Sequence, residues 1–358
     1  MFGRRCYASA GRGQGDRPRR EPLLDRRRAL QNGLATLGFL PAVSRGARAQ
    51  LRKPPVKVRY SEVVRTILYA PAYVAVAKGF LSEAGLDVTL TTAQGGDKSV
   101  AALLGGSADI ALIGPESTIY VQNSDSPTKI PMFCGLITTD GFVLVGREKI
   151  DKFEWQQLKV KQILALRPGS TPDLFLEAAL RQNGIDPIKD VKLVNNVAVA
   201  ARIGSWLAGQ NQYAIFVEPD ASQLELDGKA HFLASPGQTV GVAQGTAFMA
   251  TDKYIHDNPE IVQSWTNAIY QAQKWTETAP IAEIVKVLEP YFPGIGAQVL
   301  TAAAERYRRL KLWKTTPAID PRAIEKLQDV LVQGNVLEPA KRVKFADLVV
   351  SEFASKAR

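Results

Sequence analysis

The sequence is poor in the residues that build metal centres and disulfide scaffolds. Its 358 residues include only two cysteines and two histidines. His231 and His256 lack metal-ligand spacing and have no cysteine partner in the mature chain, so a metal site or a Cys–His pair has little support. No GxxxxGK[ST] phosphate loop is present either. These absences favour a protein without a metal or cofactor and weaken an enzymatic interpretation.

Lysine is missing from the first 49 residues, although the chain as a whole carries a net charge of +10. Residues 1–49 hold eleven arginines and three acids, and therefore carry +8. The other 309 residues hold 34 basic and 32 acidic groups, so their charge is only +2, with no basic stripe interleaved with aromatics. A nucleic-acid partner is therefore not expected.

The basic segment has the layout of an export signal. An arginine-rich start precedes an apolar stretch at residues 33–43, which is too short to span a bilayer, and "ARA" at residues 47–49 suits a signal peptidase. We expect cleavage after Ala49, a mature chain starting at Gln50, and a periplasmic protein. The signal resembles the twin-arginine type, from which Ala29 and Gln31 depart. An ordinary secretory signal or a disordered basic tail remains an alternative.

Cys134 is the only thiol that the mature chain would keep, because Cys6 lies in the signal. It sits in "KIPMFCGLIT", an apolar strand-like run, which predicts a buried structural cysteine rather than a nucleophile. No disulfide can then form within the mature chain. No lipid-attachment cysteine follows the apolar stretch, so a soluble protein is expected.

Strand-like and helix-like segments alternate from residue 56 onward, which predicts an α/β protein with mostly parallel sheets. The chain looks mainly helical from residue 246 to 331, where Trp265, Trp275 and Trp313 are expected to pack helices onto the first lobe. In one unit, strands are expected at residues 56–60, 86–92 and 110–113, and helices within residues 70–80 and 95–106. In the other, residues 162–184 are expected to form a strand, a turn and a helix, followed by a strand at 190–194, a helix at 200–209 and a strand at 213–220.

Four motifs in order identify the chain as similar to a known family. They are "PAYVAVAKGFLSEAGLDV", "GGDKSVAALLGGSADIALIGPES", "RPGSTPDLFLEAALRQNGI" and "AGQNQYAIFVEPD". Together they resemble the periplasmic substrate-binding proteins of ABC importers, and more narrowly the group that takes up nitrate, aliphatic sulfonates, taurine and thiamine-precursor pyrimidines. The resemblance covers roughly residues 54–335.

The resemblance implies a type 2 periplasmic binding protein fold, with two α/β lobes joined by two chain crossings and a ligand in the cleft. Paired βαβ units predict the same cleft, because ligands bind at the carboxyl ends of strands in open α/β sheets. The expected divisions are an export signal at residues 1–49, first-lobe segments at 50–145 and 244–335, a second lobe at 146–243, and a C-terminal tail at 336–358.

The expected function is capture of a small polar or anionic molecule and its delivery to an ABC permease and its ATPase, with a monomer as the expected state. An enzyme of thiamine-pyrimidine synthesis on the same fold is an alternative, although its cysteine-rich motif is not found here. A sensor-type binding protein that reports to a receptor is another. Hinge motion is expected near residues 145–148 and 241–246.

Candidate ligand-binding residues of the first lobe lie in two glycine turns. Gly114 and Ser117 belong to a strand-to-helix turn whose N–H groups and hydroxyl can hold an oxygen-rich group. Glu116 in the same turn can bind ligand or complement the helix dipole. Gly95 and Gly96 form a similar turn, which can bind ligand or only relieve crowding.

The second lobe contributes a possible anion site. Arg167, Ser170 and Thr171 combine a guanidinium with two hydroxyls at a helix start, although the hydroxyls can also act only as helix caps. Arg167 and Ser117 are expected to hold one ligand from opposite lobes, unless Arg167 pairs with an acid of the other lobe. Tyr69 can stack on a ligand or fix a helix, and Glu218 can accept from an amine or bridge the lobes. The sequence leaves an anion and an amine-bearing heterocycle both open.

Overall fold

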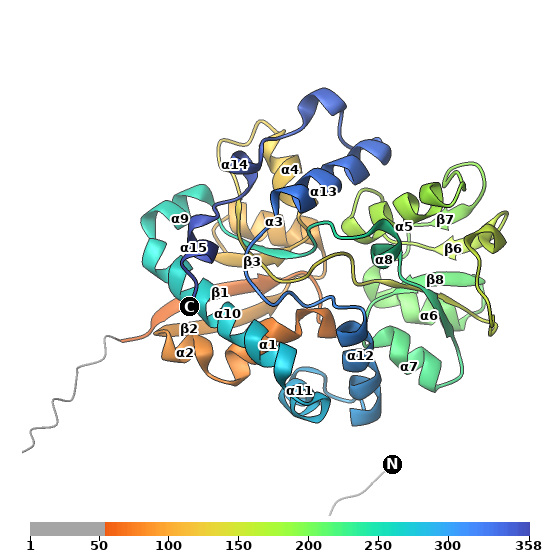
Figure 1. Ribbon diagram of the computed structural model, residues 1–358, viewed down its shortest axis with the longest axis horizontal. Helices are drawn as coiled ribbons and strands as arrows, with labels where there is room; N and C mark the ends of the chain where they lie inside the picture. Colours follow the sequence, from red (N-terminus) through yellow and green to blue (C-terminus); the bar gives the residue numbers. More distant parts are fainter. Residues whose placement is uncertain (1–53) are drawn as a thin grey trace, which may run out of the picture. The chain divides into compact units, whose positions relative to one another are not determined.

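The computed structural model describes residues 54–358, which form two lobes, each built on one five-stranded sheet (Figure 1). The strand order is β2-β1-β3-β10-β4 in the first sheet and β7-β6-β8-β5-β9 in the second. The predicted export signal lies outside the described residues. The strands are β1 (Val56–Glu62), β2 (Leu86–Thr92), β3 (Ile110–Ile113), β4 (Met132–Gly135), β5 (Val143–Gly146), β6 (Gln162–Leu164), β7 (Lys192–Val194), β8 (Tyr213–Phe216), β9 (His231–Ala234) and β10 (Ala247–Met249).

The sequence predicted mostly parallel sheets, and in each sheet one strand runs against the other four, which makes both sheets mixed. In the first sheet, β1 is parallel to β2 and β3, and β10 is antiparallel to β3 and β4. In the second, β6 is parallel to β7 and β8, and β5 is antiparallel to β8 and β9. The strands β5 and β10 are the ones that follow a crossing between lobes, so the chain enters each sheet there in the opposite direction.

Helices cover both faces of the sheets (Figure 1). The first lobe carries α1 (Ala70–Ala77), α2 (Phe80–Glu83), α3 (Gly96–Leu104), α4 (Glu116–Gln122), α9 (Asp252–Asp257), α10 (Pro259–Thr278), α11 (Ile281–Leu288), α12 (Ala297–Arg309), α13 (Pro321–Gln333), α14 (Phe345–Leu348) and α15 (Glu352–Ser355). The second lobe carries α5 (Thr171–Gln182), α6 (Arg202–Leu207) and α7 (Asp220–Leu226), and α8 (Pro236–Val240) lies in the second crossing.

The helix expected at residues 70–80 is divided in the structure. Pro71 lies in the first turn of α1, where its missing N–H costs no hydrogen bond. Gly79 then adopts a left-handed φ of 80°, a conformation that side chains other than glycine disfavour. This residue separates α1 from α2, which begins at Phe80.

Alternating side chains on the strands supply hydrophobic clusters on opposite faces of each sheet. On β3, Ile110 and Leu112 join one cluster, while Ala111 and Ile113 join the other. The first cluster also contains buried residues of α1 and α10, and the second those of α3, α4 and α13. The sheet is thus covered on both faces, which leaves its strand ends to form the site.

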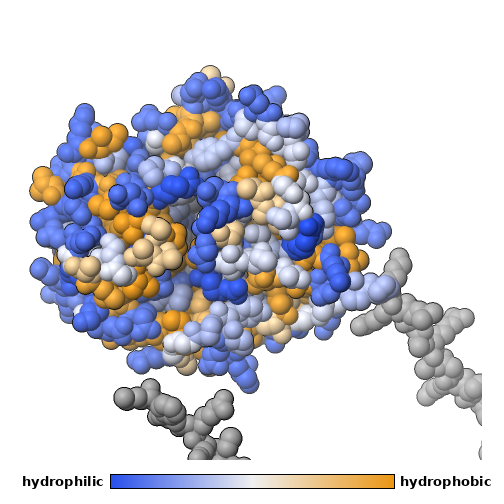
Figure 2. Space-filling model, turned by 180° about the vertical axis from the view of Figure 1, so that it is seen from behind, coloured by the Kyte–Doolittle hydropathy of each residue, from blue (hydrophilic) through white to orange (hydrophobic). Residues whose placement is uncertain are grey.

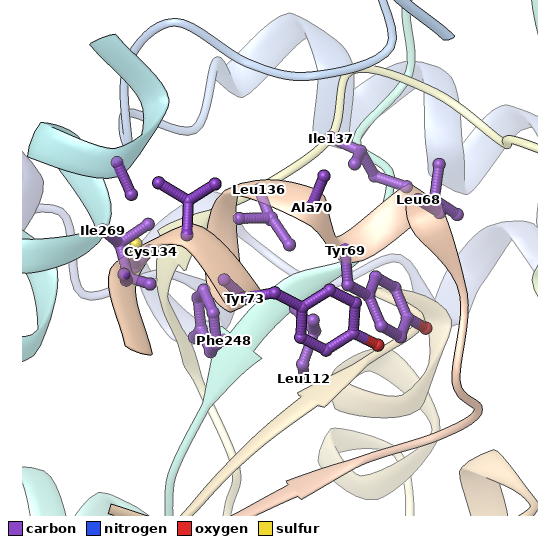
Figure 3. Packing of buried hydrophobic residues seen from close by; sticks show 14 of the residues in the cluster. Leu68, Tyr69, Ala70, Tyr73, Leu112, Cys134, Leu136, Ile137, Phe248 and Ile269 are labelled. Atoms are coloured by element: carbon purple, nitrogen blue, oxygen red, sulfur yellow. The ribbon is translucent and has the colours of Figure 1, made fainter. Parts of the chain in front are cut away.

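Cys134 on β4 is buried inside the first cluster, near Ile269 (Figure 3). Burial raises the pKa of its thiol, as expected for a structural cysteine. Trp265 is fully buried in the same cluster, and Trp275 and Trp313 pack against it. These positions confirm the prediction that the three tryptophans hold helices to the first lobe.

The chain crosses between the lobes at residues 136–142 and 235–246. The first crossing was expected near residues 145–148, but Val145 lies in β5 and pairs within the second sheet. The second was expected near residues 241–246, which fall within the observed segment. The two crossings touch one another: a Cβ on Gly237 would collide with the carbonyl oxygen of Asp140, and one on Gly245 would lie 2.7 Å from that of Thr139. Glycine is therefore required where the crossings meet.

Helix α5 also joins the lobes. Its predicted apolar face, Leu174, Phe175, Ala178 and Ala179, is buried in the cluster that contains α13 and part of the first sheet. In this structure the lobes are therefore in contact through a shared apolar layer as well as through the crossings.

Residues 336–358, expected to be a tail, pack onto the first lobe. Leu337, Leu348, Val349 and Phe353 are buried, and Val349 forms a bridge with Met132 at the edge of the sheet. Apolar residues at these positions give the segment a face to bury. Among residues 54–358, no helix has both the length and the apolar character needed to cross a membrane.

Candidate functional site

A cavity of about 180 Å³ lies where the two lobes meet. Residues that follow the parallel strands β1, β2 and β3 line it from the first lobe, and residues that follow β6 and β8 line it from the second. Both chain crossings complete its wall. Figure 2 shows a hollow on the face of the molecule opposite to that in Figure 1. The cavity is thus at the strand edge where α/β proteins bind small molecules.

Eight of the ten candidate residues line this cavity. They are Tyr69, Gly95, Gly96, Gly114, Glu116, Arg167, Ser170 and Thr171. The structure therefore brings together residues that lie up to 102 positions apart in the sequence, from Tyr69 to Thr171. Ser117 and Glu218 are not among the lining residues.

Glu116 reaches from the first lobe to the start of α5 in the second. The backbone N–H of Thr171 donates to Glu116 Oε1 at 3.3 Å, and the Thr171 hydroxyl donates to Oε2. A Cβ on Gly114 would lie 2.6 Å from Thr171 Oγ1 and would also collide with the Glu116 carboxylate. Gly114 thus makes room for this contact between the lobes.

The turn that starts α5 is stabilised by its own side chains. The Ser170 hydroxyl donates to the carbonyl oxygen of Arg167 at 2.6 Å and makes no helix-capping hydrogen bond. The N–H of Gly169 donates instead to Asp173 at 3.1 Å, while Gly169 itself takes a left-handed φ of 76°. Arg167 is exposed and makes no side-chain hydrogen bond or ion pair with another residue of the described range.

Glu218 is fully buried and already has its partners. Its carboxylate accepts from the N–H of Ser222 at 2.9 Å and pairs with Arg306 of α12. Its backbone carbonyl accepts from the Thr66 hydroxyl at 2.7 Å. Glu218 therefore bridges the lobes through Arg306. The sequence had left open an ion pair between Glu218 and Arg167, which does not form.

Ser117 lies one residue beyond the part of its turn that faces the cavity. It is buried, and its N–H donates to the carbonyl oxygen of Gly114 at 3.1 Å. The residue of this turn that meets the second lobe is Glu116. Ser117 and Arg167 were expected to hold one ligand together, because they occupy equivalent positions in two similar strand-to-helix turns. The twist of helix α4 instead directs the side chain of Glu116, the residue before Ser117, toward the cleft.

Comparisons with known proteins agree with this architecture. Residues 52–289 match the NMT1-like family. The chain belongs to the NMT1-like family. The Bacillus subtilis (strain 168) protein named "Putative binding protein YtlA" is 35% identical over 329 residues, which cover 92% of this chain and 98% of that protein.

Solved structures show how the NMT1-like chain folds. The alkanesulfonate-binding protein SsuA from Xanthomonas axonopodis pv. citri, bound to MOPS, is 20% identical with a TM-score of 0.67, covering 84% of this chain and 99% of that one. A ligand-binding component of an ABC-type import system from Staphylococcus aureus, with zinc bound, is 14% identical with a TM-score of 0.70, covering 85% and 99%. The fold is that of periplasmic binding proteins.

The cavity of this NMT1-like protein contains charged residues that the sequence did not single out. They are Arg65, Asp97, Asp140, Arg202 and Asp220. Asp220 is the last residue of the quoted motif "AGQNQYAIFVEPD", and Asp140 is an acid between two apolar runs at residues 130–137 and 142–146. An isolated acid between two buried strands was the available signal for Asp140.

Burial dominates the electrostatics of the cavity. It raises the pKa of Asp140 to about 7, and the negative charge of Glu116 adds to this increase. Burial also raises the pKa of Glu116, although the hydrogen bond from the Thr171 side chain opposes it. The pKa of Tyr69 is raised by burial first and then by Glu62, Glu116 and Asp140. Glu116 and Asp140 therefore act on one another and on the same tyrosine.

Arg202 is held by the backbone of the second sheet. Its guanidinium donates to the carbonyl oxygens of Leu164 at 3.1 Å, Ile215 at 2.7 Å and Ala165. Burial lowers its pKa to about 10, which leaves it charged at neutral pH. In the described range, no group of three or more histidine, cysteine or acidic side chains is arranged to hold a metal ion.

Proposed function

We propose that this protein is a periplasmic solute-binding protein that encloses a small polar molecule between its lobes and delivers it to an ABC permease and its ATPase. The observation that carries the proposal is a single cavity built from the strand ends of both sheets and from both crossings. A ligand there would contact both lobes only when they are together, so its binding energy would favour the closed arrangement.

The relatives support a binding role. The NMT1-like relative from Bacillus subtilis is named a binding protein, and the two solved structures are described as an alkanesulfonate-binding protein and as a component of an import system. The candidate ligands are those of the resembling group: an aliphatic sulfonate, taurine, nitrate or a thiamine-precursor pyrimidine. Export through a signal cleaved after Ala49 would place the protein where such ligands arrive.

The described histidines and Cys134 fit a binding role better than catalysis. His231, His256 and Cys134 do not line the cavity, and Cys134 lies in the core of the first lobe (Figure 3). An acid–base or nucleophilic residue has to reach the substrate directly or through one water. We therefore propose solute binding rather than thiamine-pyrimidine synthesis.

A thermal-shift screen tests the proposal. The protein is unfolded and refolded to remove bound ligand, and its melting temperature is measured with sulfonates, taurine, nitrate and pyrimidines. A ligand of the folded state at a hundred times its Kd stabilises by about 2.7 kcal/mol, so a true ligand should give a clear increase. No increase with any compound would contradict the proposal.

Two glycine variants show whether a hit occupies this cavity. Gly96 lines it, and a Cβ there would make only an ordinary contact, 3.9 Å from Ile113 Cγ2. Gly96→Phe should fill the cavity and abolish the thermal shift. Gly204→Phe is the matched control, because Gly204 is exposed on α6 with nothing within 4 Å of its Cβ position. If Gly96→Phe keeps the shift and Gly204→Phe does too, the ligand binds elsewhere.

A further inference from the structure

The start of α5, expected to hold an anionic ligand group, is already occupied by a carboxylate of the chain itself. Helix α5 has twelve residues, and its first N–H and hydroxyl, both from Thr171, donate to Glu116. Glu116 is only 7% exposed, and Gly114 leaves space for it. An anion placed here would meet this carboxylate, and two like charges in a buried site repel one another.

A second carboxylate enters the same cavity from the first crossing. Asp140 is only 4% exposed, and its Oδ2 accepts from the N–H of Phe142 at 3.1 Å. No lysine, arginine or histidine of the described range forms an ion pair with Asp140 or Glu116. A buried carboxylate without a cation is costly, so these two groups are open to a ligand that supplies positive charge or N–H donors.

None of the arginines that line the cavity forms an ion pair with these acids, although the charge of Arg167 partly opposes the increase in the pKa of Glu116 that burial causes. Arg65 is 2.9 Å from Glu62 Oε1 and also donates to Thr92. The hydrogen bonds of Arg202 go to backbone carbonyls, as described above. Arg167 is the remaining arginine, and it is exposed. Glu116 and Asp140 are therefore buried acceptors without an ion-pair partner, whereas the sequence motif around Arg167 suggested an anion site.

We propose that Glu116 and Asp140 determine the specificity of the cavity, by selecting a small ligand that presents an amine, an amidine or an amino-substituted ring and by excluding simple anions. The proposal rests on the proposed solute-binding function. Apolar side chains on the same cavity, Leu68, Phe142 and Phe216, would pack against the body of such a ligand.

The carboxylates Glu116 and Asp140 also influence the ionisation of one another, which links the binding of a cationic ligand to proton release. Burial and the charge of Glu116 hold the pKa of Asp140 near 7, while the charge of Arg167 opposes the increase that burial causes in the pKa of Glu116. The neutral titratable groups around the pair are Tyr69, Tyr120 and Tyr307, whose pKa values are raised by burial and by the two carboxylates. A cation bound between the carboxylates would favour their ionised forms. Binding of a cationic ligand should therefore release protons near neutral pH.

Probes that share one ring and differ in charge test the selection. Benzamidine and benzylamine carry cationic donors, benzoate and benzenesulfonate carry anions, and benzyl alcohol is neutral. Binding to the refolded protein is measured by calorimetry and thermal shift at about pH 8, where Asp140 is mostly ionised. We expect the cationic probes to bind at least about tenfold more tightly than the anions. Equal or tighter binding of benzenesulfonate or benzyl alcohol would overturn the proposal.

Charge-removing variants locate the effect. Glu116→Gln and Asp140→Asn keep the side-chain size and should each weaken benzamidine binding by roughly ten- to a hundredfold. Asp125→Asn is the control, because Asp125 is exposed and lies outside the cavity; it should leave binding unchanged. Unchanged affinity in both test variants, with normal melting, would overturn the assignment.

The ligand screen separates this inference from the proposed function. A hit that bears an amine or amidine and is lost in Glu116→Gln supports both. A hit that is a simple anion, such as nitrate or an alkanesulfonate without an amine, leaves solute binding intact and overturns the selection by Glu116 and Asp140. The absence of any hit contradicts the proposed function itself.

Discussion

Two buried glutamates bridge the lobes, and they are held in opposite ways. Glu218 follows β8 in the second lobe and pairs with Arg306 of the first. Glu116 starts α4 in the first lobe and meets only the uncharged donors of Thr171 in the second. The charge of Glu218 is neutralised within the fold, whereas that of Glu116 stays directed at the cavity. The same residue type at two strand ends therefore serves the framework in one case and a ligand in the other.

The largest expected effect comes from breaking the neutralised bridge. Glu218→Gln would leave Arg306, whose side chain is 9% exposed, with Glu225 as its remaining acid. We expect a loss of about 3 kcal/mol in the free energy of unfolding, the lower part of the range for breaking a buried pair. Glu116→Gln should cost less than about 1 kcal/mol, because an amide oxygen can still accept from Thr171.

Urea unfolding of the two variants measures this difference. The double variant Glu218→Gln with Arg306→Met should lose less stability than the sum of the single variants. Arg306→Met alone leaves both Glu218 and Glu225 without their cation, whereas the double variant leaves only Glu225, whose side chain is 24% exposed. Equal losses for Glu116→Gln and Glu218→Gln would remove the distinction between the two bridges.

Most of the fold follows from local sequence patterns. Residues 86–92 were expected to form a strand and do so with the same bounds, because alternation along a half-buried strand is a local property. The mixed pairing of the sheets was not predictable in this way. It depends on the direction in which β5 and β10 enter after each crossing, which no residue within those strands encodes.

The sequence predicted the backbone turns that form the site, but not the contacts between their side chains. Glycine turns after β2, β3 and β6 were visible in the sequence, and eight candidate residues line one cavity as a result. The contact of Glu116 with Thr171 joins residues 55 positions apart, and no motif indicates that the acid of one turn fills the helix start of the other. Asp140 was missed because it lies in a crossing, between periodic elements.

A moderate effect is expected from the ionisation of Asp140. Its pKa is about 7 in the fold against 3.8 without burial, so the unliganded folded state binds more protons than the unfolded state between these values. Stability contributed by this group is therefore greatest at low pH and is lost as the pH rises toward 7. Asp173 and Asp220, with pKa values of about 7 and about 6, act in the same direction.

Comparing Asp140→Asn with the wild-type protein isolates this group. The variant cannot ionise, so its stability relative to wild type should increase as the pH is raised from about 4 to 8. Denaturant unfolding across this pH range gives the difference directly. A difference that stays constant with pH would show that Asp140 has the same pKa in the folded and unfolded states.

The smallest effect is expected at Arg167, and it bears directly on the contrast between the two glutamates. Arg167 is exposed and without a described ion-pair partner, so Arg167→Ala should change the free energy of unfolding by less than about 0.5 kcal/mol. If the ligand offers donors to Glu116 and Asp140, its affinity should stay the same or rise slightly, because a nearby positive charge has been removed. If the ligand is an anion held at the start of α5, the same variant should lose a charge-assisted contact and weaken binding by roughly one to two decades. Calorimetry with the hit from the screen therefore separates a donor ligand from an anion. A large loss of ligand affinity in Arg167→Ala would mean that Glu116 does not bind the ligand and only bridges the lobes, as Glu218 does.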